Sequence, residues 1–251
     1  MILDVLLEDA GREGCMAHVP SLPGHSFRVS TIDDLETTAP MATSTYARYL
    51  SQASLTSLTS ATESLMRAAE NGTTIGFRVA EHVSGAPVWE SGNAAALFEW
   101  DRRALSDSEI RAHLHFVRRT LEELRATVSS MSPDRRRTRP ASNRRSADET
   151  FEHVGNCIWW YCSRIDDALS EPVEIPHEDP LDRIDRLFEA AEGFLLGVPV
   201  ADRATIHRPT RFPTKDPNER WTHTKACRRQ AEHAWAHVRG VRWMVETLDK
   251  E

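Results

Sequence analysis

Residues 221–248 read WTHTKACRRQAEHAWAHVRGVRWMVETL, and this stretch decides the fold of the second half of the chain. Small and apolar side chains recur in it every three or four residues, which predicts an amphipathic helix over about residues 219–248. The stripe expected to face inward consists of Ala226, Gln230, His233, His237, Val241, Met244 and Leu248. Two histidines therefore point toward the centre of a helical bundle.

His233 and His237 form an H-x-x-x-H pair, whose two imidazoles lie on one helix face and can reach one metal ion. The spacing alone is weak, since a chain with 11 histidines contains about half such a pair by chance. The inward position adds weight. Buried imidazoles one turn apart need a partner for their polar atoms, and a metal ion supplies a shared one.

Three further helices are expected before this one. Leucines and valines at helical spacing mark the first, Ser146 with Glu149 forms a capping box for the second, and Asp179 followed by Pro180 begins the third. Their expected ranges are residues 105–129, 146–169 and 180–196. Four helices joined by loops predict a four-helix bundle over residues 104–251.

The first hundred residues have strand character instead. Apolar runs predict strands at residues 2–7, 15–19, 26–29 and 73–82, and the prolines and glycine of PSLPG (residues 20–24) require a turn. Thr31 is expected to cap a helix, and residues 37–62 to form one or two weak helices. With residues 87–100 as a covering segment, residues 1–100 form one module, a small antiparallel sheet with helix. The fold class is therefore α+β.

A metal held by the last helix needs a ligand from another helix, and His153, one turn after Glu149, is the best candidate. Three imidazoles leave a coordination position for water or substrate, as in catalytic sites. Cys157, one turn further on, either faces the metal or is inert packing, which is commoner for a buried free cysteine. Glu149 and Glu232 are alternatives as hydrogen-bond partners of the ligands or as solvent-facing glutamates. The competing interpretation is that these histidines share no metal and lie separately in the core or on the surface.

Composition narrows the class of partner. The net charge of −7 argues against nucleic acid, because phosphate binding needs a concentrated basic surface. One basic cluster, residues 135–145, is either a solvated loop or a site for an anionic group. The four cysteines form no C-x-x-C pair and indicate reduced thiols, and no apolar run approaches the length of a membrane span. A cytoplasmic protein without membrane contact is expected.

Residues 137–165, RTRPASNRRSADETFEHVGNCIWWYCSRI, and residues 221–241, WTHTKACRRQAEHAWAHVRGV, resemble the DinB-like superfamily of metal-dependent four-helix proteins. The resemblance implies a divalent metal held by one histidine of the second helix and an H-x-x-x-H pair of the last. His153, His233 and His237 match these three positions. The activities it implies are transfer or isomerisation with a low-molecular-weight thiol, and amide hydrolysis.

Residues 11–50, and above all AHVPSLPG (residues 17–24) before the threonine-capped helix, resemble the HicB-like sheet module. That module occurs in antitoxins and also fused to other domains. Two features depart from it here: no helix-turn-helix segment follows, and His25 stands where a cysteine or small residue is usual. The resemblance therefore implies a fused module more than a DNA-binding antitoxin.

Together these observations predict an enzyme in which the metal activates a thiol or water for transfer, isomerisation or hydrolysis on a small molecule. Zinc is the first choice of metal, with nickel, manganese or iron as alternatives. Candidate catalytic side chains are Glu149 and Arg164, and Arg144, Arg145 and Trp160 are candidates for binding a thiol cofactor. The alternative is a non-catalytic ligand- or protein-binding module whose metal is structural or vestigial. The substrate and the oligomeric state stay open, with a homodimer among the alternatives.

Overall fold

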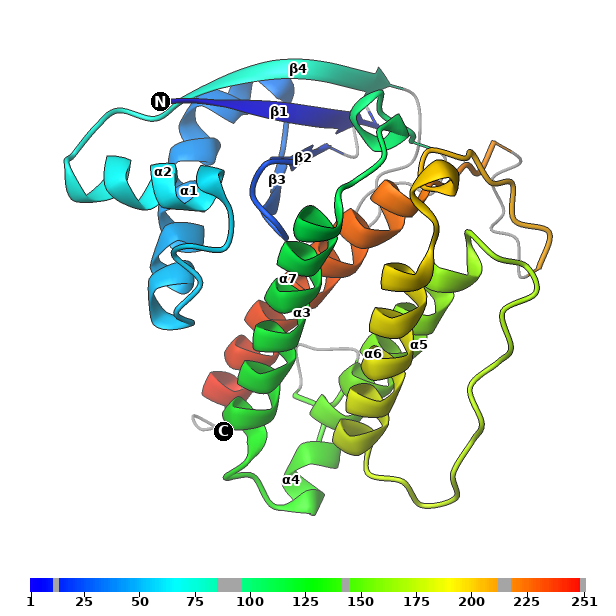
Figure 1. The fold of residues 1–251 in the computed structure, drawn as a ribbon. Helices are drawn as coiled ribbons and strands as arrows, with labels where there is room; N and C mark the ends of the chain where they lie inside the picture. Colours follow the sequence, from blue (N-terminus) through cyan, green and yellow to red (C-terminus); the bar gives the residue numbers. More distant parts are fainter. Residues whose placement is uncertain (11–13, 85–95, 141–144, 212–217, 249–251) are drawn as a thin grey trace.

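A computed structural model describes residues 1–10, 14–84, 96–140, 145–211 and 218–248 of the chain. It has the expected α+β class: a four-strand sheet with helices comes first, and a packed helical region follows. In Figure 1 the sheet lies across one end of the molecule, above the long helices.

The sheet has the strand order β3-β2-β1-β4, formed by β1 (Ile2–Asp9), β2 (Cys15–His18), β3 (Ser26–Val29) and β4 (Gly76–Ser84). The pairs β1–β2 and β2–β3 are antiparallel, but β4 pairs with β1 in parallel. The sheet is therefore mixed, and the expectation of an antiparallel sheet was wrong for its last strand. The reason is the long helical connection between β3 and β4, which brings the chain back to run in the same direction as β1.

Helices α1 (Leu35–Gln52) and α2 (Ser60–Glu70) form that connection. A short 3₁₀ turn, Ile32–Asp34, precedes α1, and Thr31 caps it as expected. The PSLPG turn between β2 and β3 packs on the helical region. Gly24 has φ of +80°, and a Cβ there would lie 2.2 Å from the Phe116 ring, so this turn needs glycine for both its conformation and its close approach.

Four long helices pack against one another in the second half: α3 (Asp107–Val128), α5 (Ala147–Ser163), α6 (Pro180–Gly197) and α7 (His223–Leu248). Helix α3 contacts α7 and α6, and α5 contacts α6 and α7, which closes a ring of neighbours. A short helix, α4 (Pro133–Arg137), lies between α3 and α5. One 3₁₀ turn, Trp100–Arg102, precedes α3, and another, Val200–Asp202, follows α6. The second helix of the bundle ends at Ser163, earlier than the expected residue 169.

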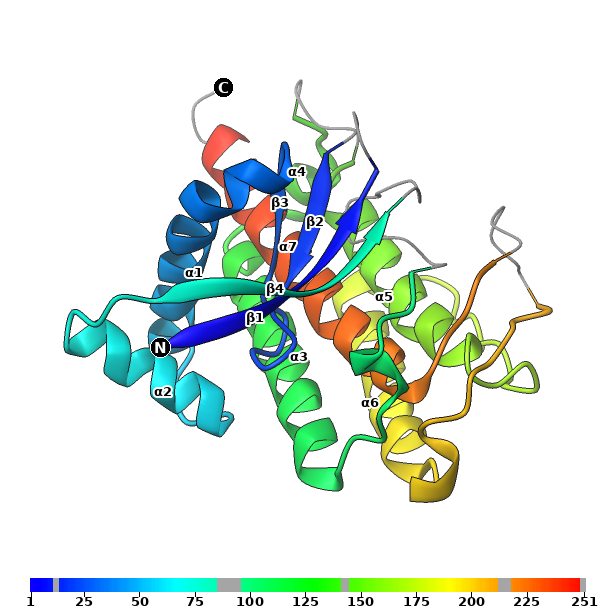
Figure 2. The same cartoon turned by 90° about the horizontal axis from the view of Figure 1, so that it is seen from above.

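Helix α7 is enclosed on more than one side. It packs against α3 and α5, and the sheet lies over it in the view of Figure 2. Every residue from Trp221 to Trp235 is buried, including the basic side chains Lys225, Arg228 and Arg229. On the side of α1, the Trp235 ring lies 4.2 Å from that of Tyr49, centroid to centroid. The inward stripe inferred from the sequence is therefore only one of the buried faces of this helix.

A chain of buried charged groups, here called the charge network, joins the sheet to α7. It consists of Glu8, His18, Asp101, Arg228 and Glu232, each no more than 2% exposed. Nδ1 of His18 is 2.8 Å from Oε1 of Glu232, and its Nε2 is 3.4 Å from Oε1 of Glu8. Arg228 donates to both oxygens of Asp101 at 2.8 and 2.9 Å and to Glu232 at 3.0 Å. Each carboxylate faces a basic group, although Nη1 of Arg228 also lies 3.2 Å from Nδ1 of His18, and the ion pairs of Glu8, His18 and Glu232 fix α7 against β1 and β2.

Three further expectations can be compared with the described residues. No helix among them is both long enough and apolar enough to cross a membrane. All four cysteines are free thiols, as expected. Of the expected covering segment, residues 87–95 lie outside the described residues, while Phe98 is buried.

Candidate metal centre

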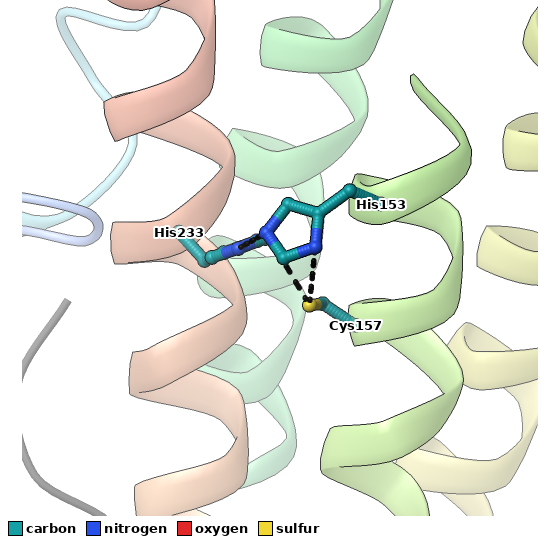
Figure 3. A group of neighbouring side chains, drawn as sticks. All are labelled: His153, Cys157 and His233. Carbon is teal, nitrogen blue, oxygen red and sulfur yellow. Dashed lines mark hydrogen bonds between the residues drawn. The ribbon is translucent and has the colours of Figure 1, made fainter. Parts of the chain in front are cut away.

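The three histidines singled out in the sequence converge between α5 and α7. Nε2 of His233 lies 3.2 Å from Nε2 of His153 and 3.0 Å from Nε2 of His237. His153 comes from α5 and the other two from α7, so residues 80 positions apart face one another. Figure 3 shows the rings of His153 and His233 pointing toward each other across the gap between their helices. We call these three side chains the imidazole cluster.

Local sequence sets the position of each ring. The hydroxyl of Ser146 accepts from the backbone N–H of Glu149, and the Glu149 carboxylate accepts from that of Ser146, so the expected capping box begins α5. His153 lies two turns into this helix. On α7, the spacing of four residues places His233 and His237 one above the other on the side that faces α5.

The environment favours the neutral form of the two histidines on α7. Burial lowers the pKa of His233 well below 6.5, and the neighbouring imidazoles and the charges of Arg229 and Arg145 lower it further. Burial also lowers the pKa of His237 to about 3, again with contributions from His153 and Arg145. Neutral imidazole is the form that ligates metals.

The contacts within the cluster fit a shared cation better than hydrogen bonds. One imidazole nitrogen donates or accepts one ordinary hydrogen bond, whereas Nε2 of His233 faces two other Nε2 atoms. A cation accepts a lone pair from all three at once. Nitrogens bound to one tetrahedral zinc at about 2.0–2.1 Å would lie about 3.3–3.4 Å apart. The distances of 3.2 and 3.0 Å are within a few tenths of an ångström of this spacing.

Cys157 belongs to the same group of donors. Its Sγ lies 3.7 Å from Nδ1 and 3.8 Å from Nε2 of His153. A donor atom from each of His153, Cys157 and His233 falls within 4.8 Å of the others, so these three side chains could hold a metal ion (Figure 3). Inert packing is the commoner role of a free cysteine, but the structure places this thiol among the candidate ligands.

Glu149, a candidate catalytic residue, is occupied at the start of α5. Besides its part in the capping box, its carboxylate accepts from Nε of Arg139 at 2.7 Å and from a terminal nitrogen of the same guanidinium. The Arg139 guanidinium lowers the pKa of Glu149 to about 2. The structure therefore engages Glu149 in capping and an ion pair, and does not bring it into the imidazole cluster.

Of the basic residues proposed for cofactor binding, Arg145 is near enough to the cluster to act on it. Its charge adds to the effect of burial in lowering the pKa of His233 and His237. Burial raises the pKa of the Cys157 thiol to about 12, and the charge of Arg145 opposes this rise. Arg145 is exposed, just before the start of α5. Arg144 lies outside the described residues. Elsewhere in the basic loop, Arg136 pairs with Asp179 and Asp148.

Arg164 and Trp160, the remaining candidates, lie together further along α5. The Arg164 guanidinium sits over the Trp160 ring at 4.7 Å and donates to the carbonyl of Arg211 at 2.8 Å. It also pairs with Glu219 at 3.7 Å, and its side chain is fully buried. These contacts hold the loop before α7 to the end of α5, which is a structural role for Arg164.

Sequence reasoning missed the charge network, although it lies next to the cluster. From the sequence, Glu232 is expected either to be a hydrogen-bond partner of a ligand histidine or to face solvent. The structure buries Glu232 against His18 and Arg228, on the sheet side of α7. The signal available was the i, i+4 pair of Arg228 and Glu232, which is ordinary on exposed helices. Nothing local in the sequence identified His18, 214 residues away, as the partner.

Comparisons with known proteins add no assignment. Neither the family models, nor the curated proteins, nor the solved structures that were searched contain a match to this chain. What the chain can do is therefore argued from its own geometry.

Proposed function

We propose that this chain is a metal-dependent enzyme of the DinB-like type, in which His153, His233 and His237 hold one divalent cation. The observation that carries the proposal is the convergence of three Nε2 atoms from two helices, at 3.0 and 3.2 Å. Nε2 of His233 lies within 3.2 Å of the Nε2 atoms of both other histidines, so nitrogen donors from two helices are close enough to share one cation. The resemblance of residues 137–165 and 221–241 to that superfamily supports the same three ligands.

A divalent cation in this position would lower the pKa of a bound water or thiol and supply a nucleophile near neutral pH. The chain's own residues orient the ligands and exclude bulk water. His233 is 6% exposed, and the charge network fixes the helix on which it lies. Arg145, exposed beside the cluster, would bind a carboxylate of the substrate or of a thiol cofactor. In this proposal residues 104–251 carry the reaction on a small molecule, and residues 1–100 form a fused HicB-like module.

A non-catalytic module with a structural metal is the second candidate, and one observation favours it. Structural zinc sites have four protein ligands, and Sγ of Cys157 lies beside His153 as a fourth donor. The two candidates differ in whether an external ligand reaches the metal.

The test is a thiol titration of the full chain loaded with Co²⁺. The enzyme proposal expects the visible cobalt bands to shift when a low-molecular-weight thiol such as cysteine is added, because the thiolate enters the coordination sphere. It also expects His233→Ala to lose bound cobalt and this response together while keeping its helix content by circular dichroism. Cobalt bands that stay unchanged when mycothiol, bacillithiol, glutathione and cysteine are each added would overturn the thiol-dependent proposal in favour of the structural one.

A further inference from the structure

Cys157 differs from the other three cysteines in what its thiol faces. Sγ of Cys162 accepts from the side chain of Gln230 at 3.4 Å, Sγ of Cys15 contacts Asp9 at 3.6 Å, and Cys227 lies 3.9 Å from His223. Within the part of the chain that the structure describes, Cys157 is the cysteine that shares a donor group with imidazoles from two helices. Its position is therefore special to the candidate metal centre.

The distances suit a mixed nitrogen and sulfur coordination shell. With Zn–N of about 2.0–2.1 Å and Zn–S of about 2.3 Å, a tetrahedral site would place sulfur and nitrogen about 3.5–3.6 Å apart. Sγ of Cys157 is 3.8 Å from Nε2 of His153, the nitrogen that faces His233. This sulfur–nitrogen distance differs from its expected value about as little as the nitrogen–nitrogen distances of the imidazole cluster differ from theirs.

The helix geometry explains how one element presents two ligands. Cys157 follows His153 by four residues, so both side chains lie on the same face of α5. The pair on α5 thus mirrors the pair His233 and His237 on α7, which has the same spacing. His153 and Cys157 from α5 and His233 from α7 meet in the space between the two helices (Figure 3).

We propose that Cys157 is the fourth ligand of this metal centre, which makes it a site of three imidazoles and one thiolate. The inference rests on the proposed metal centre. Its thiol proton would leave to solvent as the sulfur–metal bond forms. A thiolate in the ligand set favours thiophilic cations such as Zn²⁺ and Co²⁺ over Mn²⁺ and Mg²⁺. Water or a thiol substrate would then enter as a fifth ligand or by displacing Cys157.

The decisive experiment compares the full wild-type chain with Cys157→Ser, Cys157→Ala and the control Cys162→Ser, each loaded with Co²⁺ and free of added thiol. Wild type and Cys162→Ser should show a near-ultraviolet thiolate-to-cobalt charge-transfer band. Both Cys157 variants should still bind one cobalt per chain through the imidazoles and lose the band. Circular dichroism checks that each variant is folded.

The outcomes separate this inference from the function on which it rests. Cobalt bound to wild type without the band, or a band that survives in Cys157→Ala, would overturn the role of Cys157 and leave the three-imidazole centre standing. Failure of wild type to bind cobalt would overturn both.

Metal selectivity gives a second measurement. In a competition between Zn²⁺ and Mn²⁺, Cys157→Ser should lower the preference for zinc by at least about tenfold. Removal of a residue that only hydrogen-bonds to a metal ligand already lowers metal affinity by about tenfold or more, so removal of a ligand should have at least this effect. Cys162→Ser should keep the wild-type preference. An unchanged preference in Cys157→Ser would contradict the inference.

Discussion

Helix α7 takes part in two polar clusters, and they are composed in different ways. The charge network is fully buried, whereas in the imidazole cluster His233 is buried and His153 and His237 are half-buried. In the charge network, on the sheet side, each carboxylate pairs with Arg228 or His18, which outweighs the contact between these two basic groups. In the imidazole cluster, on the α5 side, like groups face one another. In the first arrangement protein groups supply the counter-charges. In the second, Nε2 of His233 faces the Nε2 atoms of two other histidines, which we propose are joined by a cation.

Burial of polar groups does not by itself indicate function. A network with its own counter-charges holds elements together, and removal of one member leaves a buried charge uncompensated. A cluster of like donor atoms destabilises the folded state when no ligand is bound, and a bound ligand stabilises it. Each cluster therefore responds differently to mutation, metal and pH.

The largest effect is expected in the charge network. Arg228→Leu removes the partner shared by Asp101 and Glu232, both fully buried, and should lower the free energy of unfolding by about 3–5 kcal/mol. Urea denaturation in the presence of a chelator measures it. Arg125→Leu is the matched control, because Arg125 pairs with exposed aspartates and should cost about 0–1 kcal/mol. Equal losses in the two variants would contradict a structural role for the network.

The imidazole cluster should respond to metal instead. At 100 times its dissociation constant, Zn²⁺ should stabilise the wild-type chain by about 2.7 kcal/mol, by mass action on the folded state. His233→Ala should gain little from the same concentration, because it lacks the nitrogen that faces both other histidines. Urea denaturation with and without chelator gives both values. The same metal stabilisation in variant and wild type would place the metal elsewhere.

A smaller effect is expected from pH. Burial lowers the pKa of His18, but attraction to Glu232 and hydrogen bonds to Glu232 and Glu8 outweigh it, so the net pKa is raised above 6.5 despite repulsion from Arg228. Its contribution to stability is complete below pH 6.5 and is lost as pH rises through the folded-state pKa, by at most about 1.4 kcal/mol per pH unit.

The measurement is urea denaturation of wild type and His18→Gln from pH 6 to pH 8, with chelator present. Burial lowers the pKa of Lys225 to about 7, which gives an opposite trend over part of this range that cancels between the two proteins. The advantage of wild type over His18→Gln should shrink as pH rises. A constant or growing advantage would show that His18 is not held as an imidazolium.

The smallest effect concerns the start of α5. Ser146→Ala removes the hydroxyl that caps this helix and should cost about 1 kcal/mol. The metal stoichiometry should stay at the wild-type value, because the cap lies two turns before His153. Loss of metal at unchanged helix content would mean that the cap also positions the ligand.

Much of the helical region could be predicted from local sequence, because caps and helical periodicity are local signals. Ser146 and Asp179 begin their helices as expected, and His233 and His237 share a face because of their spacing. His153 was the best candidate for a ligand from another helix, and the resemblance to a family supported the same choice, although no spacing links it to α7. Its place beside His233 is a property of the packed helices.

Features that depend on distant segments could not be predicted. The parallel pairing of β4 with β1 follows from how the chain crosses over through α1 and α2, which the strand pattern does not encode. The stripe on α7 suggested one buried face because charged residues such as Arg228 and Glu232 normally face solvent. Only partners from distant segments, His18 on β2 for Glu232 and Asp101 in the 3₁₀ turn before α3 for Arg228, allow these charges to be buried.

The most direct test of the central claim is X-ray anomalous scattering from crystals of the full chain grown with Zn²⁺ and measured at the zinc edge. The account expects one strong anomalous peak between α5 and α7, about 2.0–2.1 Å from Nε2 of His153, His233 and His237. Crystals that lack a peak there, or in which the His153 ring lies apart from the other two, would contradict it.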